Sequence, residues 1–268
     1  MRWRSHNLVH FCHISTPIKY NSAVQRQAGR PTRGIDATVS QIARTFKSAL
    51  NWYRQVSDLR FTLLSDGGSD RALIPVLRWL LIENGVVRPI QPSWADLRGL
   101  RRPPKGLANR LRTAVDYWPC ELLFVHRDAE RSNPEARREE IRNALEQAQP
   151  ISSPALCVVP VRMLEAWFLS NEGAIREAAG NPNGAHALDL PQMTRIESMP
   201  DPKGVLHEVL REASGLSGRR RRGFNVGPAI HRIAQISDGF SHLRTLPAFD
   251  QLERDVRDTV VSEGWNQQ

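Results

Sequence analysis

The stretch that decides the fold is residues 61–70, Phe61-Thr62-Leu63-Leu64-Ser65-Asp66-Gly67-Gly68-Ser69-Asp70. An apolar run of strand length enters a Gly-Gly turn between two aspartates, and an amphipathic helical pattern follows. A second apolar run, residues 122–125, ends just before another acidic pair, Asp128 and Glu130. Because the carboxyl ends of buried parallel strands meet at one edge of a sheet, we expect these acids to converge there.

Segments with strand and helix patterns alternate along the middle of the chain. Strands are predicted at 61–64, 86–91, 122–125 and 155–161, and helices at 69–84, 106–117 and 134–147. This alternation predicts an α/β fold with a mainly parallel, doubly wound sheet flanked by helices. Further along, only helices are predicted, at 202–213, 228–236 and 247–261.

The chain has 268 residues and a net charge of +9 that is unevenly distributed. Residues 1–60 contain ten Lys or Arg against two Asp. We predict a basic, disordered arm (1–36), a leading helix (37–59), an α/β domain (60–175) and a helical C-terminal extension (176–268). A transit peptide, translated upstream sequence and a segment that touches nucleic acid are alternatives for the arm.

Cysteine spacing and hydropathy indicate a cytoplasmic protein. Cys12, Cys120 and Cys157 show no C-x-x-C spacing, and the latter two lie in or beside apolar runs where a thiol behaves as a small hydrophobe. We expect a reducing compartment. The most apolar segment is interrupted by Arg78 and Glu83, so no run is long enough to span a bilayer.

The acids that follow the strands have the composition of a divalent-metal site. Asp128 and Glu130 are two residues apart in an extended segment, so their side chains are expected on the same side. Asp66, at the end of a neighbouring strand, adds a third ligand, and Glu165 could complete the site or orient a water. Oxygen-only ligand sets favour Mg²⁺ or Mn²⁺ over zinc.

A structural interpretation of the first acids is also open. Asp66 and Asp70 suit a turn and a helix start, and for Asp70 we prefer this interpretation. Ser69 is predicted to be the N-cap of the helix that follows.

These motifs resemble the TOPRIM-like family. The similarity lies in the acid-Gly-x-Ser-Asp segment 66–70 after a first strand, the acidic pair 128–130 after a hydrophobic strand, and the later Glu-Ala-Trp-Phe-Leu segment 165–169. Residues 201–206 and 247–249 add a weaker likeness. The branch that this chain resembles is an uncharacterised bacterial one, often encoded beside ATPases in phage-defence loci.

The resemblance implies a TOPRIM-like, Rossmann-like fold and metal-dependent phosphate chemistry. Asp66 matches the first-motif acid, which is usually glutamate, and Asp128 and Glu130 match the metal-binding D-x-D pair. Glu165 matches the Glu-Ala-Trp element. The shorter acid at 66 and the longer acid at 130 keep the oxygen chemistry but leave the general acid and base unassigned. An ABC-type or AAA-type ATPase partner that restrains or triggers the protein in antiviral defence is also implied.

Hydrolysis by water is the expected reaction. A topoisomerase needs a nucleophilic tyrosine, and Tyr20, Tyr53 and Tyr117 are not in a recognisable catalytic setting. We therefore predict a nuclease in which Mg²⁺ held by Asp66, Asp128 and Glu130 activates water. The alternatives are a non-catalytic binding or regulatory subunit of a defence complex and a phosphatase acting on small molecules.

Basic residues are candidates for binding the nucleic acid, because arginine clusters contact backbone phosphate without reading sequence. The alternatives are solvated loops and, for His126, a packed structural histidine. The candidates are Arg101, Arg102, Lys105, His126, Arg127, Arg219, Arg220, Arg221 and Arg222.

Overall fold

The computed structural model describes residues 57–130 and 132–267. The predicted basic arm (1–36) and nearly all of the predicted leading helix (37–59) lie outside the described residues. All described residues belong to one compact unit. No helix among the described residues is long and apolar enough to cross a membrane.

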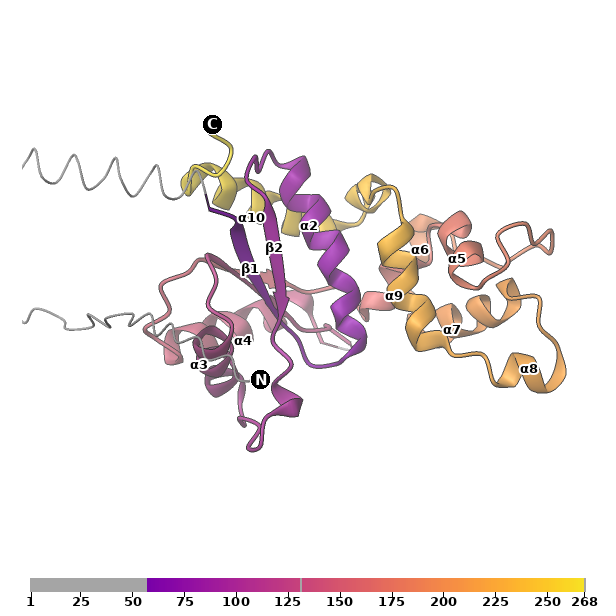
Figure 1. Ribbon diagram of the computed structural model, residues 1–268, viewed down its shortest axis with the longest axis horizontal. Helices are drawn as coiled ribbons and strands as arrows, with labels where there is room; N and C mark the ends of the chain where they lie inside the picture. The colour runs from indigo at the N-terminus through magenta and orange to yellow at the C-terminus, as the bar shows by residue number, and fades with distance from the viewer. Residues whose placement is uncertain (1–56, 131, 268) are drawn as a thin grey trace, which may run out of the picture. The chain divides into compact units, whose positions relative to one another are not determined.

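Four parallel strands form one sheet in the order β2-β1-β3-β4 (Figure 1). They are β1 (Leu59–Leu64), β2 (Ile90–Trp94), β3 (Leu122–His126) and β4 (Ala155–Val158). The predicted α/β class is confirmed, and the central strands are β1 and β3, which precede the acidic motifs. The predicted bounds of the second strand, 86–91, are wrong: β2 begins later and contains Pro92, which an edge strand tolerates because one side of it needs no N–H donor.

Side chains alternate between the two faces of the sheet, and each face packs against its own helices. Leu63 and Phe124 belong to the core that contains α2, whereas Leu64 and Val125 belong to the core that contains α3 and α4. Helices therefore cover both faces, as parallel strands require. The elements between the strands are η1 (Ser69–Ala72), α2 (Leu73–Glu83), η2 (Leu97–Gly99), α3 (Leu107–Tyr117) and α4 (Pro134–Gln147).

The helix predicted at 69–84 forms in two parts, a 3-10 turn η1 followed by α2. Ser69 is not the N-cap that the sequence predicts, because its hydroxyl lies 3.2 Å from Asp70 Oδ1 and donates to it. Pro75 is the third residue of α2, where its missing N–H has no intrahelical partner to lose. Gly85, with φ of +91°, follows the end of the helix.

After β4 the chain is helical, and its last helix returns to the sheet (Figure 1). Trp167 and Phe249 stack edge to face at 5.3 Å inside the core that also contains Phe61. The predicted extension thus shares its hydrophobic core with the α/β part. Its elements are η3 (Leu164–Phe168), α5 (Glu172–Ala178), α6 (Met193–Ile196), α7 (Pro202–Ala213), α8 (Gly218–Arg222), α9 (Val226–Ile236), η4 (Ser241–Thr245) and α10 (Pro247–Ser262).

Candidate functional site

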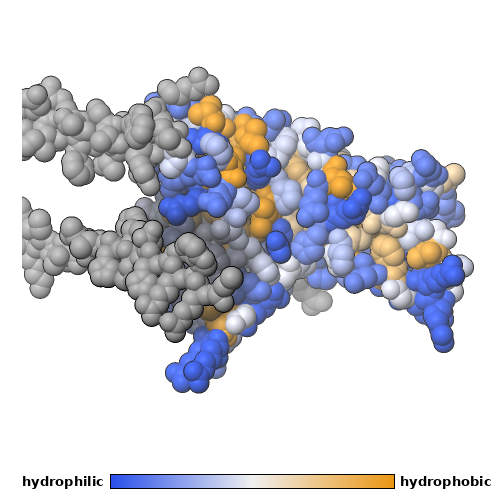
Figure 2. Space-filling model, in the orientation of Figure 1, coloured by the Kyte–Doolittle hydropathy of each residue, from blue (hydrophilic) through white to orange (hydrophobic). Residues whose placement is uncertain are grey.

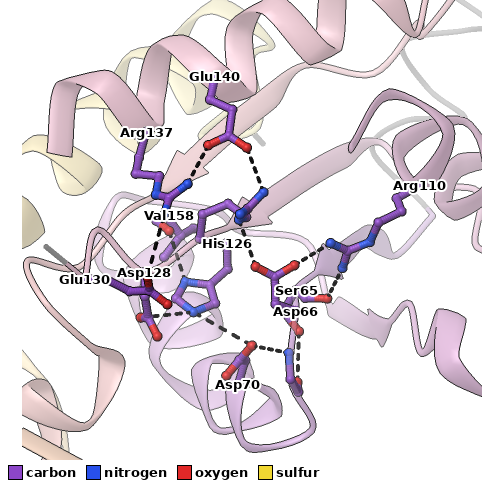
Figure 3. Close-up of polar contacts among 12 residues, drawn as sticks. Ser65, Asp66, Asp70, Arg110, His126, Asp128, Glu130, Arg137, Glu140 and Val158 are labelled. Atoms are coloured by element: carbon purple, nitrogen blue, oxygen red, sulfur yellow. Dashed lines mark hydrogen bonds and ion pairs between the residues drawn. The ribbon is translucent and has the colours of Figure 1, made fainter. Parts of the chain in front are cut away.

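The acids meet at the carboxyl edge of the sheet, beyond β1, β3 and β4, but they divide into two groups (Figure 3). Asp66 faces Arg110, whereas Asp70 and Asp128 face His126. The predicted grouping of Asp66, Asp128 and Glu130 is therefore not the one that the fold assembles.

Asp66 is held by two arginines. Arg127 Nε lies 2.8 Å from its Oδ2, and Arg110 Nη1 binds its Oδ1. Arg110 also donates to the Ser65 carbonyl oxygen at 2.6 Å, and Arg127 donates to Glu140 at 2.9 Å. The charge of Asp66 is thus balanced within the protein. The same contacts occupy Arg127, which the sequence analysis assigns to phosphate binding.

Asp70 is buried in the turn, with 8% of its surface exposed. Its Oδ2 accepts a hydrogen bond from the Gly67 backbone N–H at 2.7 Å, and the same oxygen lies 3.9 Å from Nε2 of His126. The helix-start role that the sequence analysis prefers for Asp70 therefore describes only part of what this residue does. Asp70 closes the Gly-Gly turn and also faces the second acidic motif.

His126 is the last residue of β3 and is buried, which favours the alternative of a packed structural histidine over a phosphate-binding one. Its Nδ1 lies 3.0 Å from the carbonyl oxygen of Val158, which can only accept, so Nδ1 carries a proton. Nε2 then points at Asp70 and, at 3.5 Å, at Asp128 Oδ1. A lone pair on Nε2 that faces two carboxylates is unfavourable. A positive charge between the ring and the two carboxylates, from a proton on Nε2 or from a bound cation, would stabilise this arrangement.

Asp128 lies in an electrostatic environment that disfavours its ionised form. Burial, together with the charges of Glu165 and Asp70, raises its pKa to about 6 against the opposing effects of His126 and the Leu164 N–H. That N–H donates to Asp128 Oδ1 at 3.0 Å. The carboxylates of Asp70 and Glu165 are therefore close enough to repel that of Asp128.

Glu165 is the second residue of η3 and is buried, with a side chain that is 6% exposed. Lys203 Nζ, from the first turn of α7, lies 3.1 Å from its Oε1. Burial alone would lower the pKa of Lys203, but the charge and hydrogen bond of Glu165 raise it above its ordinary value. Lys203 is thus a protonated member of the cluster that the sequence analysis did not identify as a site residue. The one sequence signal that pointed to Lys203 is its place in segment 201–206, which carries the weaker likeness to the family.

Glu130 does not project beside Asp128. Its φ of +52° places it in the left-handed region, so the chain is no longer extended and the alternation of strand side chains does not apply. Its backbone N–H donates to the Arg162 carbonyl oxygen at 2.8 Å, and its carboxylate, in a side chain that is 63% exposed, lies 3.8 Å from Arg137. The prediction that the side chains of Glu130 and Asp128 lie on the same side of an extended segment is therefore wrong.

The two arginine-rich segments lie far apart on the surface. Arg101, Arg102 and Lys105 are exposed in the loop after η2. Arg219 to Arg222 form the helix α8 instead of the loop that the sequence analysis expects, and Arg221 is paired with Glu208. Figure 2 shows the loop and α8 as hydrophilic projections at opposite ends of the view, so they cannot form one continuous basic channel.

The two cysteines within the described range are free and half-buried. Burial raises the pKa of both Cys120 and Cys157, the latter to about 11. Both therefore stay protonated, as expected of small hydrophobes.

No group of three or more His, Cys, Asp or Glu in residues 57–130 and 132–267 has the geometry of a complete metal site. Asp70 and Asp128 nevertheless approach one ring nitrogen, and both offer the hard oxygen donors that Mg²⁺ prefers.

Comparisons of the chain with protein-family models, with curated proteins and with solved structures found no match.

Proposed function

We propose that the protein is a metal-dependent, TOPRIM-like nuclease that hydrolyses nucleic-acid phosphodiesters, and that Asp70, Asp128 and Glu165 are its essential acids. The observation that carries this proposal is the meeting of Asp70 and Asp128 at Nε2 of the buried His126 ring, with Glu165 close enough for its charge to act on Asp128. Such clusters at the carboxyl edge of a parallel sheet are common sites of chemistry.

The donor set fits a divalent cation. Proteins usually bind Mg²⁺ through one or two carboxylates and leave the remaining positions to water and substrate phosphates, so a site without three protein ligands is not unusual. Asp70 and Asp128 would hold the ion. When bound, Mg²⁺ or Mn²⁺ supplies an acidified water and neutralises charge on the phosphate.

Neighbouring residues support the two ligands. The bond from His126 Nδ1 to the Val158 carbonyl oxygen fixes the ring, so that Nε2 faces the acids. Lys203 places a fixed positive charge beside Glu165 while its side chain remains half exposed. That charge can contact a non-bridging phosphate oxygen that arrives from solvent.

Control by a partner ATPase, within a bacterial antiviral defence system in the cytoplasm, is part of the same proposal. It is supported by the order of the acidic motifs along the chain and by their position after parallel strands. The exposed arginines of α8 and of the loop after η2 offer two separate surfaces for nucleic acid or for that partner.

A second candidate function is a non-catalytic binding or regulatory subunit. It is favoured by the ion pairs of Asp66, because the residue that matches the first-motif acid is bound to Arg110 and Arg127 and does not face Asp128. In this case the acidic edge would serve only as a docking surface.

The decisive experiment measures cleavage of tRNA, single-stranded DNA and duplex DNA, with Mg²⁺ or EDTA, and with or without the protein encoded by the neighbouring gene. The proposal expects Mg²⁺-dependent cleavage that is lost in Asp128→Ala while thermal unfolding shows an intact fold. Cleavage that survives this substitution would indicate a contaminant and would overturn the proposal. Turnover of phosphomonoesters alone would identify a phosphatase.

A further inference from the structure

A large cavity lies beside the acidic cluster, between η1 with the start of α2, the edge strand β2 and the N-terminal part of α9. Its volume of about 910 Å³ is within the usual range of ligand pockets. Figure 1 shows α2 beside β2, and α9 packs against both η1 and α2. The cavity thus opens where the helical C-terminal part meets the edge of the sheet.

The lining combines a flat apolar surface with polar groups that have no partner among the described residues. Trp94 and Pro92 provide the apolar part, from β2. Arg71, His231 and Gln235 provide the polar part, and their side chains make no hydrogen bond or ion pair with any described residue. Burial, together with the charge of Arg71, lowers the pKa of His231, so its ring is neutral at pH 7 and both donates and accepts.

The ring of Trp94 is fixed in place. Its Nε1 donates to Ser65 Oγ at 3.0 Å, and the guanidinium of Arg98 lies over the ring at 5.2 Å. Arg98 lines a second, smaller cavity of about 160 Å³ beside Asp66, whereas Trp94 lines both cavities. The part of Trp94 that lines the larger cavity is therefore open to a ligand.

The cavity is connected to the acids through adjacent residues. Arg71 follows Asp70 in the sequence, and the charges of both residues act on His231. A ligand that fills the cavity and contacts Arg71 therefore reaches the residue next to an acid of the proposed site.

We propose that this cavity binds one unpaired nucleobase of a single-stranded polynucleotide, with Arg71 on a neighbouring phosphate. The inference rests on the proposed nuclease function and names its substrate class. An aromatic surface stacks on any base, and neutral imidazole and amide groups hydrogen-bond to base edges. The bases of a duplex are paired and stacked, and one of them would have to be extruded before it could enter.

The test is fluorescence anisotropy of the full chain with a fluorescein-labelled single-stranded oligonucleotide, as DNA and as RNA, and with the matching duplex. EDTA is present throughout, so binding is measured without cleavage. Gly227→Leu fills the cavity from the first turn of α9, where no atom beyond Asn225 lies near an added Cβ. Gly173→Leu, in the first turn of α5, is the matched control, because its only near neighbour is Asn171. Arg71→Ala is matched by Arg78→Ala on α2.

Single strands are expected to bind at least about tenfold more tightly than the duplex, and Gly227→Leu and Arg71→Ala should each weaken binding by about tenfold. The two controls should remain within about twofold of the parent protein. Equal binding of duplex and single strands, or unchanged binding in Gly227→Leu, would overturn the inference. If the inference about the cavity fails in this way, Mg²⁺-dependent cleavage by the same preparations would still support the proposed nuclease function. Selective binding without any cleavage would support the cavity and overturn the nuclease.

Discussion

Two aspartates four residues apart, Asp66 and Asp70, have opposite surroundings. Asp66 is half exposed and is bound by Arg110 and Arg127. Asp70 is buried, and among the described residues its only ion-pair partner is His126, which it shares with Asp128. Two arginines balance the negative charge of Asp66. Asp70 and Asp128 share one histidine, so the positive charge around them is smaller than their own negative charge.

This difference separates a structural acid from a candidate functional one. An acid that is neutralised by arginines stabilises its surroundings and has no need of a ligand. The charges of Asp70 and Glu165 contribute to the raised pKa of Asp128, and a cation or a phosphate-bound metal would relieve that repulsion. The comparison therefore supports the proposal, in which Asp66 stabilises the fold and Asp70, Asp128 and Glu165 are the functional acids.

The largest effect is expected on cleavage. Asp128→Asn should reduce Mg²⁺-dependent cleavage by about a thousandfold or more, because it removes a carboxylate from the site. Asp66→Asn should reduce it by less than about tenfold, since Asp66 acts only by positioning its arginines. Initial rates of both variants on one substrate give the comparison, and the reverse order would contradict it.

Stability should depend on pH through Asp128. Its pKa is raised by burial to about 6 in the folded protein, compared with 3.8 for an ordinary aspartate, so ionisation opposes folding as the pH rises between these values. Below pH 4 the group contributes nothing, and above pH 6 it costs on the order of 3 kcal/mol. Asp128→Asn should therefore match the parent protein at pH 4 and exceed its free energy of unfolding at pH 7.

Urea unfolding in EDTA at both pH values checks this difference. Glu139→Gln, an exposed residue on α4, is the control and should give the same difference from the parent at both pH values. A constant difference between Asp128→Asn and the parent protein would mean that Asp128 does not titrate in this range.

A smaller change in stability, of the opposite sign, is expected at Asp66. Asp66→Ala leaves Arg110 and Arg127 without their shared partner and should cost about 1 kcal/mol, because the pair is only partly buried. Asp250→Ala, in the exposed pair with Arg254, should cost less than about 0.5 kcal/mol. Combining Asp66→Ala with Arg110→Ala should be less than additive in chemical unfolding. Additivity would show that the ion pair does not couple the two residues.

The smallest effects are expected at Glu130. Its left-handed backbone suits glycine, and its carboxylate is exposed and lies near Arg137. Glu130→Gly should leave the free energy of unfolding within about 0.5 kcal/mol of the parent. The cleavage rate should stay within about twofold. A large loss of cleavage would show that Glu130 belongs to the site, and it would contradict the proposed grouping of Asp70, Asp128 and Glu165.

Local signals made much of the fold predictable. The bounds of α4 and α7 match the predicted ranges 134–147 and 202–213, because each helix begins with a proline after a residue that caps it. Asn133 accepts from the Glu135 N–H at 2.9 Å, and Asp201 accepts from the Gly204 N–H at 2.9 Å. Such caps depend only on neighbours in the sequence, so the sequence alone reveals them.

The grouping of the acids depends on contacts between distant segments. The arginines that bind Asp66 come from α3 and from the residue after β3, and Lys203 reaches Glu165 from α7. The turn at Glu130 is fixed by a backbone hydrogen bond to Arg162, beyond β4. The sequence predicted which edge of the sheet carries the acids, whereas tertiary packing decides which of them face one another.

Calorimetric titration of Mn²⁺ or Mg²⁺ into the full chain tests the central claim most directly. The parent protein and Asp66→Asn are predicted to bind the ion with similar affinity, and Asp128→Asn is predicted to lose at least about tenfold, because the proposed site has Asp70 and Asp128 as its protein ligands. Unchanged binding in Asp128→Asn together with lost binding in Asp66→Asn would contradict the account.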